Sequence, residues 1–588
     1  MDLAERELAA MDADSESGAG VDRRRFVLLS LAAAAASTLG GRAIVQAQST
    51  GAAAPAAQAQ IPALSLGNGE APALQFQPWP GGTGALMEQL VRERGTAAFA
   101  RTPFAAERWS GAVPSSDEDL AFLPAHRLSA LLKARKITSS RLTDIYLERL
   151  NRLNPALLCA VTILDADARA EAARADAEIA AGKYRGPLHG LPYGVKDLFS
   201  VKGHPTTWGA GDFEHRVIDE DAEVVVRLRE AGAVLLAKLS TGLFAQNDQW
   251  FRGRTNNPWN LVQGSSGSSA GPGSATAAGC VAFSIGTETQ GSIVSPSIRN
   301  GISALRPTFG RVSRYGGMTL AWSMDRVGPM CRTVEDCAMV FSVIHGVDPK
   351  DPSTVTTPFQ FDRNIRLGSL RVGVDPAAPK EFVDKLRALG LSPREVGPRP
   401  TIAGSGSGLA VEDAAAFDEY VQRKAKEIGL DLTTLPEPRP GAAPAVPTPP
   451  PPGSPPANPM APADWNPRFV SGRTTRAFDF MQQQRRRYAL VATWADYMKD
   501  LDMFIAAPAV DVGPTAQTGH PCVVVPYTFG VPAQPTGGPN AAQQPRLDLK
   551  PQPICATIIG NLYRDDAILA VAHQFQLHTD VHLRRPVL

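Results

Sequence analysis

The chain has 588 residues, of which 44% are hydrophobic and 20% are charged, a balance typical of a globular protein with a large core. Its length allows about four domains, although a single large α/β domain also reaches this size. The formal net charge of +1 argues against a broad nucleic-acid surface, because such a surface carries clustered excess lysine and arginine.

The N-terminus has the composition of an export signal. Three arginines at 23–25 precede an apolar run that ends at Ala36, and Val45-Gln46-Ala47 offers a small-residue cleavage site. The run is too short to span a bilayer as a stable helix, so we predict a signal peptide over residues 1–47 and no stable membrane insertion after cleavage. An uncleaved anchor is the alternative. The paired arginines resemble a twin-arginine signal, which predicts a periplasmic or secreted protein.

Two further segments are predicted to lie outside the packed core. Residues 48–80 are rich in Ala, Gln, Pro and Gly and predict a disordered linker. Residues 436–462 contain the run PTPPPPGSPPANP, which cannot form a helix or a central strand. We interpret this segment as a polyproline-like surface insertion, with docking of a partner as the alternative. The rest of residues 81–588 is then one domain.

Helices and short buried strands alternate along that domain. Apolar periodicity predicts helices over 124–135, 138–153, 165–181, 221–231, 333–345, 380–389, 411–428, 474–500 and 566–580. Apolar runs predict strands over 234–237, 370–374, 503–507 and 522–525. The alternation indicates an α/β fold rather than separate α and β domains. The arginines at 485–487 are expected to lie on a solvated helix face.

The six cysteines do not follow a metal-binding pattern. None belongs to a C-x-x-C pair or lies at a zinc-ligand spacing from histidine, so we expect no zinc site. Most lie in apolar runs and are expected to pack as small core residues. They are Cys159, Cys280, Cys331, Cys337, Cys522 and Cys555.

The segment Gly264–Pro307 has an unusual composition. Serine and glycine crowd both its ends, and an apolar core at residues 280–285 separates them. A flexible serine-rich linker would not carry such a core. We therefore predict a packed loop–helix–strand–loop element that presents hydroxyl groups.

A serine hydrolase is one hypothesis for this segment. The run Gly267-Ser268-Ser269-Ala270-Gly271 fits the nucleophile-elbow pattern G-x-S-x-G, but no buried strand directly precedes it, as an elbow requires. A Ser-His-Asp triad is therefore not the favoured reading. Its histidine would be one of His345, His520, His573, His578 and His582.

A buried lysine is the better candidate for a base. Lys196 lies in the apolar run 191–199, where burial penalises the charged amine and favours the neutral one. Its neighbour Asp197 leaves an ordinary ion pair as the alternative, and Lys238 competes in a similar run. A neutral lysine accepts a proton from a serine hydroxyl, which is the activation that acyl transfer requires.

Three motifs resemble the amidase signature family and occur in the family's order. They are Gly190–Asp197 (GLPYGVKD), Ser268–Pro272 (SSAGP) and Gly286–Ile293 (GTETQGSI). The resemblance extends from about residue 125 to residue 345 and resumes weakly near the C-terminus. It implies one large α/β domain with a mixed twisted sheet surrounded by helices, and chemistry that requires no metal or organic cofactor.

The resemblance also implies a Ser–cis-Ser–Lys triad. Ser292 is then the nucleophile, Ser268 the bridging serine and Lys196 the base. Ser268 is preferred over Ser265, because its separation from Ser292 matches the family. The implied oxyanion-hole donors are the backbone N–H groups of Thr289, Gln290 and Gly291.

Three positions depart from the family's pattern. Glu288 stands where the family has Asp, Gln290 where it has Gly or Ala, and Val294 where it has Arg. None of these changes removes a member of the triad. One hypothesis is that Arg299 replaces the missing arginine.

The sequence therefore predicts an exported amidase that acts on a small-molecule amide through an acyl-enzyme at Ser292. Esters and carbamates suit the same machinery. One alternative is the glutamine-hydrolysing A-type subunit of a tRNA-dependent amidotransferase, which the export signal opposes. Another is a catalytically retired exported binding protein on the same scaffold, which Gln290 and Val294 motivate.

Overall fold

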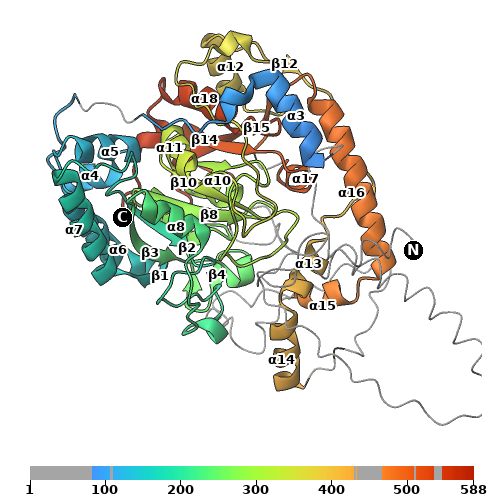
Figure 1. Ribbon diagram of the computed structural model, residues 1–588, viewed down its shortest axis with the longest axis horizontal. Helices are drawn as coiled ribbons and strands as arrows, with labels where there is room; N and C mark the ends of the chain where they lie inside the picture. Colours follow the sequence, from blue (N-terminus) through green and yellow to red (C-terminus); the bar gives the residue numbers. More distant parts are fainter. Residues whose placement is uncertain (1–81, 106–109, 430–431, 433–466, 509–510, 535–545) are drawn as a thin grey trace, which may run out of the picture. The chain divides into compact units, whose positions relative to one another are not determined.

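The computed structural model describes residues 82–105, 110–429, 432, 467–508, 511–534 and 546–588. These residues belong to one compact unit (Figure 1). The predicted signal peptide at 1–47, the predicted linker at 48–80 and the proline-rich segment at 436–462 lie outside them. Within the described ranges, none of the helices combines the length and apolar character that crossing a bilayer requires.

An 11-stranded mixed sheet is the centre of the fold (Figure 1). In spatial order its strands are β1 Ala160–Ile163, β3 Val234–Leu239, β2 Pro192–Lys196, β8 Phe283–Glu288, β10 Arg326–Cys331, β9 Ser303–Arg306, β14 Cys522–Gly530, β15 Gln552–Gly560, β13 Met503–Ala506, β11 Val372–Val374 and β12 Arg394–Glu395. Two hairpins lie outside this sheet, β4 Gln249–Trp250 with β5 Gly253–Arg254 and β6 Asn256–Asn257 with β7 Asn260–Gly264.

The middle of the sheet brings distant motifs together. Strand β2 pairs in parallel with β3 on one side and with β8 on the other. Strand β8 also pairs antiparallel with β10, which places Glu288 opposite Arg326. Because parallel neighbours end at the same edge of a sheet, Lys196 at the end of β2 and the turn after β8 meet at one edge.

Helices flank the sheet on both faces. They are α3 Gly82–Arg94, α4 Asp117–Phe122, α5 Ala125–Lys133, α6 Ser139–Leu157, α7 Asp165–Ala180, α8 Glu223–Glu230, α9 Ala270–Ala277, α10 Val294–Asn300, α11 Val334–Ile344, α12 Lys380–Ala388, α13 Leu409–Ala416, α14 Asp418–Ile428, α15 Pro467–Arg473, α16 Ala477–Met498, α17 Val512–Thr518 and α18 Asp565–Gln576. Short 3₁₀ turns are η3 Thr96–Phe99, η4 Gly211–Phe213, η5 Leu243–Ala245, η6 Leu367–Ser369 and η8 Val581–Leu583.

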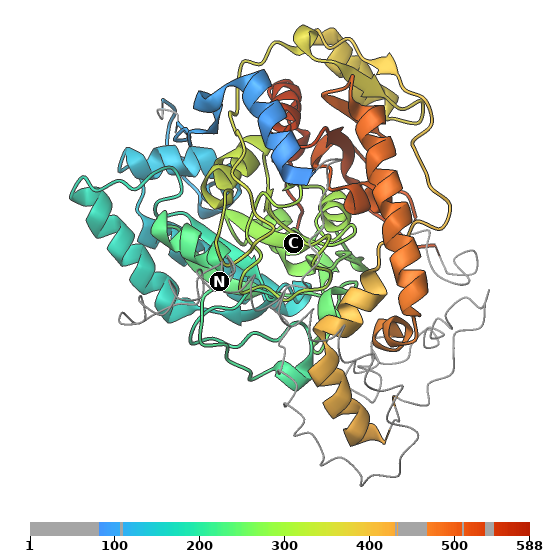
Figure 2. The same cartoon turned by 45° about the vertical axis from the view of Figure 1, so that its right-hand side comes forward.

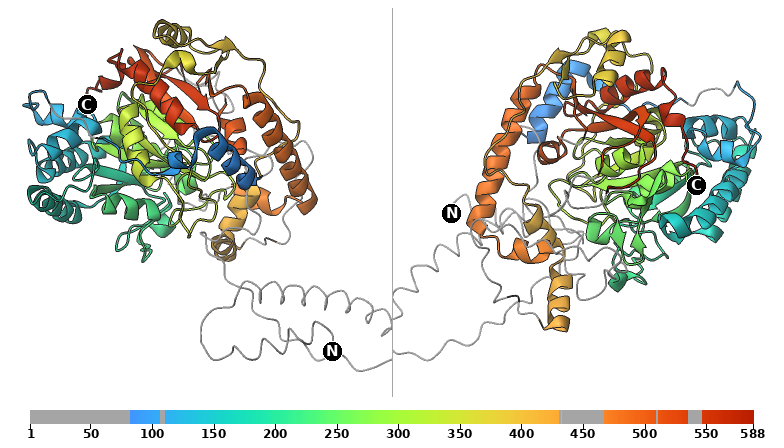
Figure 3. Two further views of the ribbon diagram at one scale, coloured as in Figure 1. Left: turned by 45° about the horizontal axis from the view of Figure 1, so that its top comes forward. Right: turned by 180° about the vertical axis from the view of Figure 1, so that it is seen from behind.

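The central strands bury both faces, because successive side chains point into two different cores. On β13, Met503 and Ile505 belong to the larger core, whereas Phe504 and Ala506 belong to the smaller one. Helices α5, α6, α8, α11 and α18 contribute to the larger core, and α10 and α16 to the smaller. Figures 2 and 3 show α16, in orange, along one side of the C-terminal strands.

The predicted α/β domain with a mixed sheet is confirmed. The predicted loop–helix–strand–loop element at Gly264–Pro307 is also present, with α9 as its helix and β8 as its strand. Strand β15 was not predicted from the sequence, because Pro553 and the polar residues Gln552 and Thr557 interrupt its apolar pattern. Its register against β14 nevertheless spans Cys522 to Gly530.

Two predictions in the second half of the chain are wrong. The single helix expected over 411–428 is broken at Phe417, where the side chain turns into an aromatic cluster with Phe244 and Phe469. The arginines at 485–487 do not all face solvent, since Arg487 is only 1% exposed. Its guanidinium donates hydrogen bonds to carbonyl and hydroxyl oxygens of neighbouring segments.

Candidate active site

Lys196 is the last residue of β2 and is fully buried. Its Nζ donates hydrogen bonds to Ser268 Oγ at 2.8 Å and to Thr287 Oγ1 at 2.8 Å. Thr287 belongs to β8, the strand that pairs with β2. The structure therefore brings the predicted base into contact with the predicted bridging serine. It also adds Thr287, a member of the third motif that the sequence alone did not distinguish.

The surroundings of Lys196 favour a neutral amine. Burial lowers its pKa well below that of an exposed lysine, and the charges of Asp325 and Glu288 oppose this shift only in part. In the part of the chain that the structure describes, the polar contacts of Nζ are with hydroxyl and carbonyl oxygens, not carboxylates. An uncharged amine carries a lone pair that can accept a proton.

Ser268 lies in the loop between β7 and α9, and its peptide bond with Gly267 is cis. Only glycine fits at position 267, because an added Cβ would lie 1.7 Å from the carbonyl oxygen of Asn247. Ser266 adopts a φ of +60°, a left-handed conformation that is unfavourable for a residue with a Cβ. Close approach between two backbone segments thus explains the glycine and serine content of this loop.

Ser292 follows the turn after β8 and is half-buried. Its carbonyl oxygen accepts a hydrogen bond from the backbone N–H of Ser269 at 3.1 Å. The predicted nucleophile therefore lies beside the residue that follows Ser268, although α9 and β8 separate them in the chain. The three residues of the implied triad gather at one edge of the sheet.

The nucleophile elbow considered for Gly267–Gly271 does not fit the structure. Its central serine, Ser269, is fully buried. Its hydroxyl donates to Thr287 O at 3.0 Å and accepts from Thr287 N at 3.2 Å, so it is engaged in tying α9 to β8. Of the candidate histidines, His520 is buried against Thr518, whose Oγ1 lies 2.8 Å from Nδ1.

The turn Thr289–Gly291 offers backbone donors. Among the described residues, the N–H groups of Gln290 and Gly291 donate to no other protein atom. Gly291 has a φ of +102°, and an added Cβ would lie 3.0 Å from Ser295 Oγ. The Gln290 side chain is exposed and does not fill the turn. Two N–H groups are thus left to bind a developing oxyanion.

Glu288 fixes the far side of this turn. One carboxylate oxygen accepts from two backbone N–H groups at the start of α10, both at 2.8 Å, and the other accepts from Arg306 Nη1 at 3.0 Å. Burial favours a raised pKa for Glu288, but Arg306 and these backbone donors hold it below its ordinary value. The hypothesis that Arg299 substitutes for the arginine absent at Val294 stays a prediction. In the structure Arg299 donates to the carbonyl oxygen of Gly264 at 3.2 Å.

Lys238, the competing lysine, has a different environment. It is fully buried on β3, and its Nζ lies 2.8 Å from Asp197 Oδ1 in an ion pair. It also donates to Pro205 O at 2.7 Å and to Thr206 Oγ1 at 2.5 Å. Burial lowers the pKa of Lys238, and the Asp197 carboxylate opposes that shift. Asp197 is therefore the partner of Lys238 and not of Lys196.

All six cysteines are buried and free. They occupy core positions, as the sequence predicts for most of them. Within the described ranges, no group of three or more histidine, cysteine, aspartate or glutamate side chains is placed to hold a metal ion.

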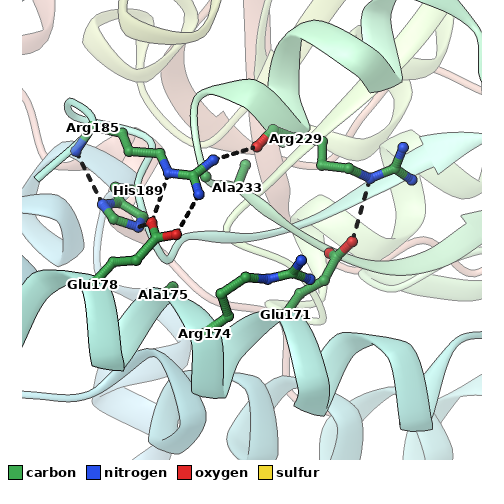
Figure 4. Close-up of a pocket in the computed structure, with 9 residues that line it drawn as sticks. Glu171, Arg174, Ala175, Glu178, Arg185, His189, Arg229 and Ala233 are labelled. Atoms are coloured by element: carbon green, nitrogen blue, oxygen red, sulfur yellow. Dashed lines mark hydrogen bonds and ion pairs between the residues drawn. The ribbon is translucent and has the colours of Figure 1, made fainter. Parts of the chain in front are cut away.

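A polar pocket lies between α7 and the loop before β2 (Figure 4). Glu178 accepts a hydrogen bond from Arg185 Nε at 2.7 Å and lies 3.2 Å from His189 Nε2. Arg229 Nε lies 3.5 Å from Glu171 Oε1. Because these charges compensate one another, we assign the pocket to the packing of α7 rather than to a ligand.

Comparisons with known proteins agree with this fold. The Amidase family model matches residues 141–390. The A-type subunit of the glutamyl-tRNA(Gln) amidotransferase from Methylococcus capsulatus is 35% identical over 508 residues, covering 78% of this chain and 97% of the relative. The putative amidase AmiD of Mycobacterium tuberculosis is 31% identical over 506 residues, covering 81% of this chain and 98% of the relative.

A solved structure of an amidase also aligns with this chain. The native peptide amidase from Stenotrophomonas maltophilia aligns with a TM-score of 0.61 and 26% identity, covering 79% of this chain and 98% of that chain. Together the fold and the three motifs define an α/β protein of the amidase class. The chain belongs to the amidase signature family.

Proposed function

We propose that the protein is an exported amidase that hydrolyses carboxylic amides through an acyl-enzyme on Ser292. The observation that carries the proposal is the contact of 2.8 Å between Lys196 Nζ and Ser268 Oγ, in a site where burial favours the neutral amine. Family membership and the resemblance to a peptide amidase support the reaction class.

In the first half of the reaction, Lys196 acts as the base. Its Nζ lone pair takes the hydroxyl proton of Ser268, and Ser268 Oγ takes the proton of Ser292. Ser292 Oγ then bonds to the carbonyl carbon of the amide, and the carbonyl π electrons move onto oxygen. The N–H groups of Gln290 and Gly291 stabilise that oxyanion.

In the second half, the proton held by Lys196 returns through Ser268 to the amide nitrogen. The carbon–nitrogen bond breaks, and the amine or ammonia leaves with that proton. Water then gives a proton to the same relay and attacks the ester carbonyl of acylated Ser292. The carboxylic acid is released and the serine hydroxyl is restored.

Labelling by a fluorophosphonate probe tests the nucleophile. We expect wild-type protein to be labelled and Ser292→Ala to be unlabelled. Ser295→Ala is the matched control, because Ser295 is a half-buried serine in the next turn of the chain and should keep full labelling. A folded wild-type protein that resists the probe would favour the retired binding scaffold instead.

A second candidate function is the A-type subunit of an amidotransferase. The identity of 35% to such a protein over 97% of that relative's length favours it. Two measurements separate the candidates. An exported amidase should appear in the extracytoplasmic fraction and hydrolyse simple amides alone, whereas the amidotransferase component should stay in the cytoplasm and hydrolyse glutamine only with its partner subunits. A panel of aliphatic, aryl and peptide amides, with esters and carbamates, would then define the substrate.

A further inference from the structure

Asp325 is a buried carboxylate that none of the three motifs includes. It precedes β10, and since Arg326 pairs with Glu288, Asp325 lies opposite Thr289. Its Oδ1 accepts a hydrogen bond from Thr289 Oγ1 at 2.5 Å. Its Oδ2 accepts from two backbone N–H groups, those of Leu320 at 2.7 Å and Ala321 at 3.0 Å. All three partners are donors, which suits an ionised carboxylate.

A small cavity is lined both by Asp325 and by Thr287, a hydrogen-bond partner of Lys196. The cavity has a volume of about 20 Å³, and its wall includes Thr287, Thr289 and Asp325. Thr287 is also the residue whose hydroxyl accepts a hydrogen bond from Lys196. The size is close to that of one water molecule, and apolar side chains such as Phe199 and Leu320 form much of the rest of the wall. Lys196 and Asp325 therefore each hydrogen-bond a threonine of this cavity wall, Thr287 and Thr289 respectively.

Two other carboxylates near Lys196 form ion pairs with buried cations. Glu288 is paired with Arg306 at 3.0 Å, and Asp197 is paired with Lys238 at 2.8 Å. The charges of both Glu288 and Asp325 act on Lys196, and of these two Asp325 is the one without a lysine or arginine ion pair among the described residues. Its negative charge favours the protonated form of the lysine and so opposes the effect of burial.

The charges that face Asp325 itself are also engaged. Arg314 lines the cavity and is paired with Asp351 at 2.9 Å. Arg326, which lines it as well, donates to three backbone carbonyl oxygens. The charge of Asp325 acts on Glu412 of α13, a carboxylate that accepts hydrogen bonds from Ser323. Burial raises the pKa of Asp325, and its three hydrogen bonds oppose that rise.

We propose that Asp325 is a positioning residue that anchors the oxyanion turn through Thr289 and keeps a negative charge beside Lys196. This inference rests on the proposed function, because it gives Lys196 and the turn their roles. Asp325 does not touch the reacting atoms. It acts through Thr289 on the geometry of the turn and through its charge on the protonation of the base.

Two substitutions separate these effects in the purified full chain. Asp325→Asn removes the charge, and the acidic limb of the kcat/KM profile should move to lower pH by about one unit, since a lost opposite charge lowers the pKa of a lysine. Thr289→Val removes the anchor and keeps the charge. It should lower kcat about tenfold or more at every pH without moving the acidic limb, and Thr289→Ser should restore the rate.

The pH profiles and kcat values of these variants decide whether Asp325 has this role. Profiles of Asp325→Asn and Thr289→Val that both superimpose on the wild type would overturn the inference. If Asp325→Asn does not fold, the Thr289 pair carries the test, and equal kcat for Thr289→Val and wild type overturns it. Fluorophosphonate labelling of wild-type Ser292 is measured first, so that a failure of the proposed function is distinguished from a failure of this inference.

Discussion

The protein contains two fully buried lysines one register step apart on neighbouring parallel strands, and they have opposite surroundings. Lys238 on β3 faces the carboxylate of Asp197 at 2.8 Å. Lys196 on β2 faces the hydroxyl oxygens of Ser268 and Thr287, both at 2.8 Å. Similar apolar sequence thus places one lysine in an ion pair and the other beside two hydroxyl groups.

The comparison shows that the partner, and not burial alone, decides what a buried lysine does. An ion pair keeps both charges, and removal of one partner leaves the other buried and uncompensated. Hydroxyl partners supply no opposite charge, so burial favours the neutral amine, which is the form that can act as a base. The same substitution at the two positions should therefore have opposite consequences.

The largest expected effect is on catalysis at Lys196. We expect Lys196→Met to lower kcat/KM by about a thousandfold or more, because general-base catalysis contributes about 10²- to 10⁴-fold. Methionine is similar in length and needs no hydrogen bond, so the melting temperature should stay the same or rise. Steady-state kinetics on an amide and thermal melting monitored by circular dichroism check this. Activity within tenfold of the wild type would mean that another group is the base.

At Lys238 the same substitution should act on stability instead. We expect Lys238→Met to lower the free energy of unfolding by about 3–5 kcal/mol, because Asp197 is left buried without its cation. The kcat of the folded fraction should stay within a few-fold of the wild type. Urea unfolding measures the first quantity, and active-site titration with the fluorophosphonate corrects the second. A stable but inactive Lys238→Met would reverse the assignment of the two lysines.

A double variant provides the control for that loss of stability. Asp197→Asn in the Lys238→Met background removes the orphaned charge, while the amide oxygen can still accept from the backbone N–H of Thr207, which donates to Asp197 at 3.1 Å. Most of the lost stability should return. A double variant as unstable as Lys238→Met would show that packing, and not charge, explains the loss.

The candidate site was predictable from the sequence where its residues lie in short contiguous motifs. Lys196, Ser268 and Ser292 each stand in such a run, and the parallel pairing of β2 with β8 brings the first and third motifs together. The relation of Asp197 to Lys238 was not predictable, because adjacent residues in a strand point to opposite faces. Only the position of β3 beside β2 shows which lysine that carboxylate meets.

Partners that depend on the register of distant strands were not predictable either. Arg306 reaches Glu288, and Asp325 reaches Thr289, only because β10 pairs with both β8 and β9. The burial of Arg487 depends on carbonyl and hydroxyl oxygens that other segments supply. Each of these contacts joins polar residues whose local sequence looks like ordinary surface, so hydrophobic periodicity gives no signal for them.

The smallest expected effect that distinguishes the two lysines is the pH dependence of the free energy of unfolding. Burial lowers the pKa of Lys196 in the folded state. At any pH between this folded-state pKa and the ordinary lysine pKa of about 10.4, Lys196 is protonated in the unfolded chain and neutral in the folded one. Stability therefore rises with pH across this window, by at most about 1.4 kcal/mol per unit, and the cost of burying Lys196 is greatest below it.

Lys196→Met removes this contribution, and the difference in unfolding free energy between variant and wild type isolates it from all other titrating groups. Measured by urea unfolding from about pH 6 to about pH 9, the advantage of the variant should be largest at the acidic end and shrink as pH rises. Lys238→Met makes a useful contrast, because Asp197 opposes the shift at that position and the corresponding slope should be shallower. A difference for Lys196→Met that does not change with pH would show that the lysine keeps its proton on folding, and the hydroxyl relay would then lack its base.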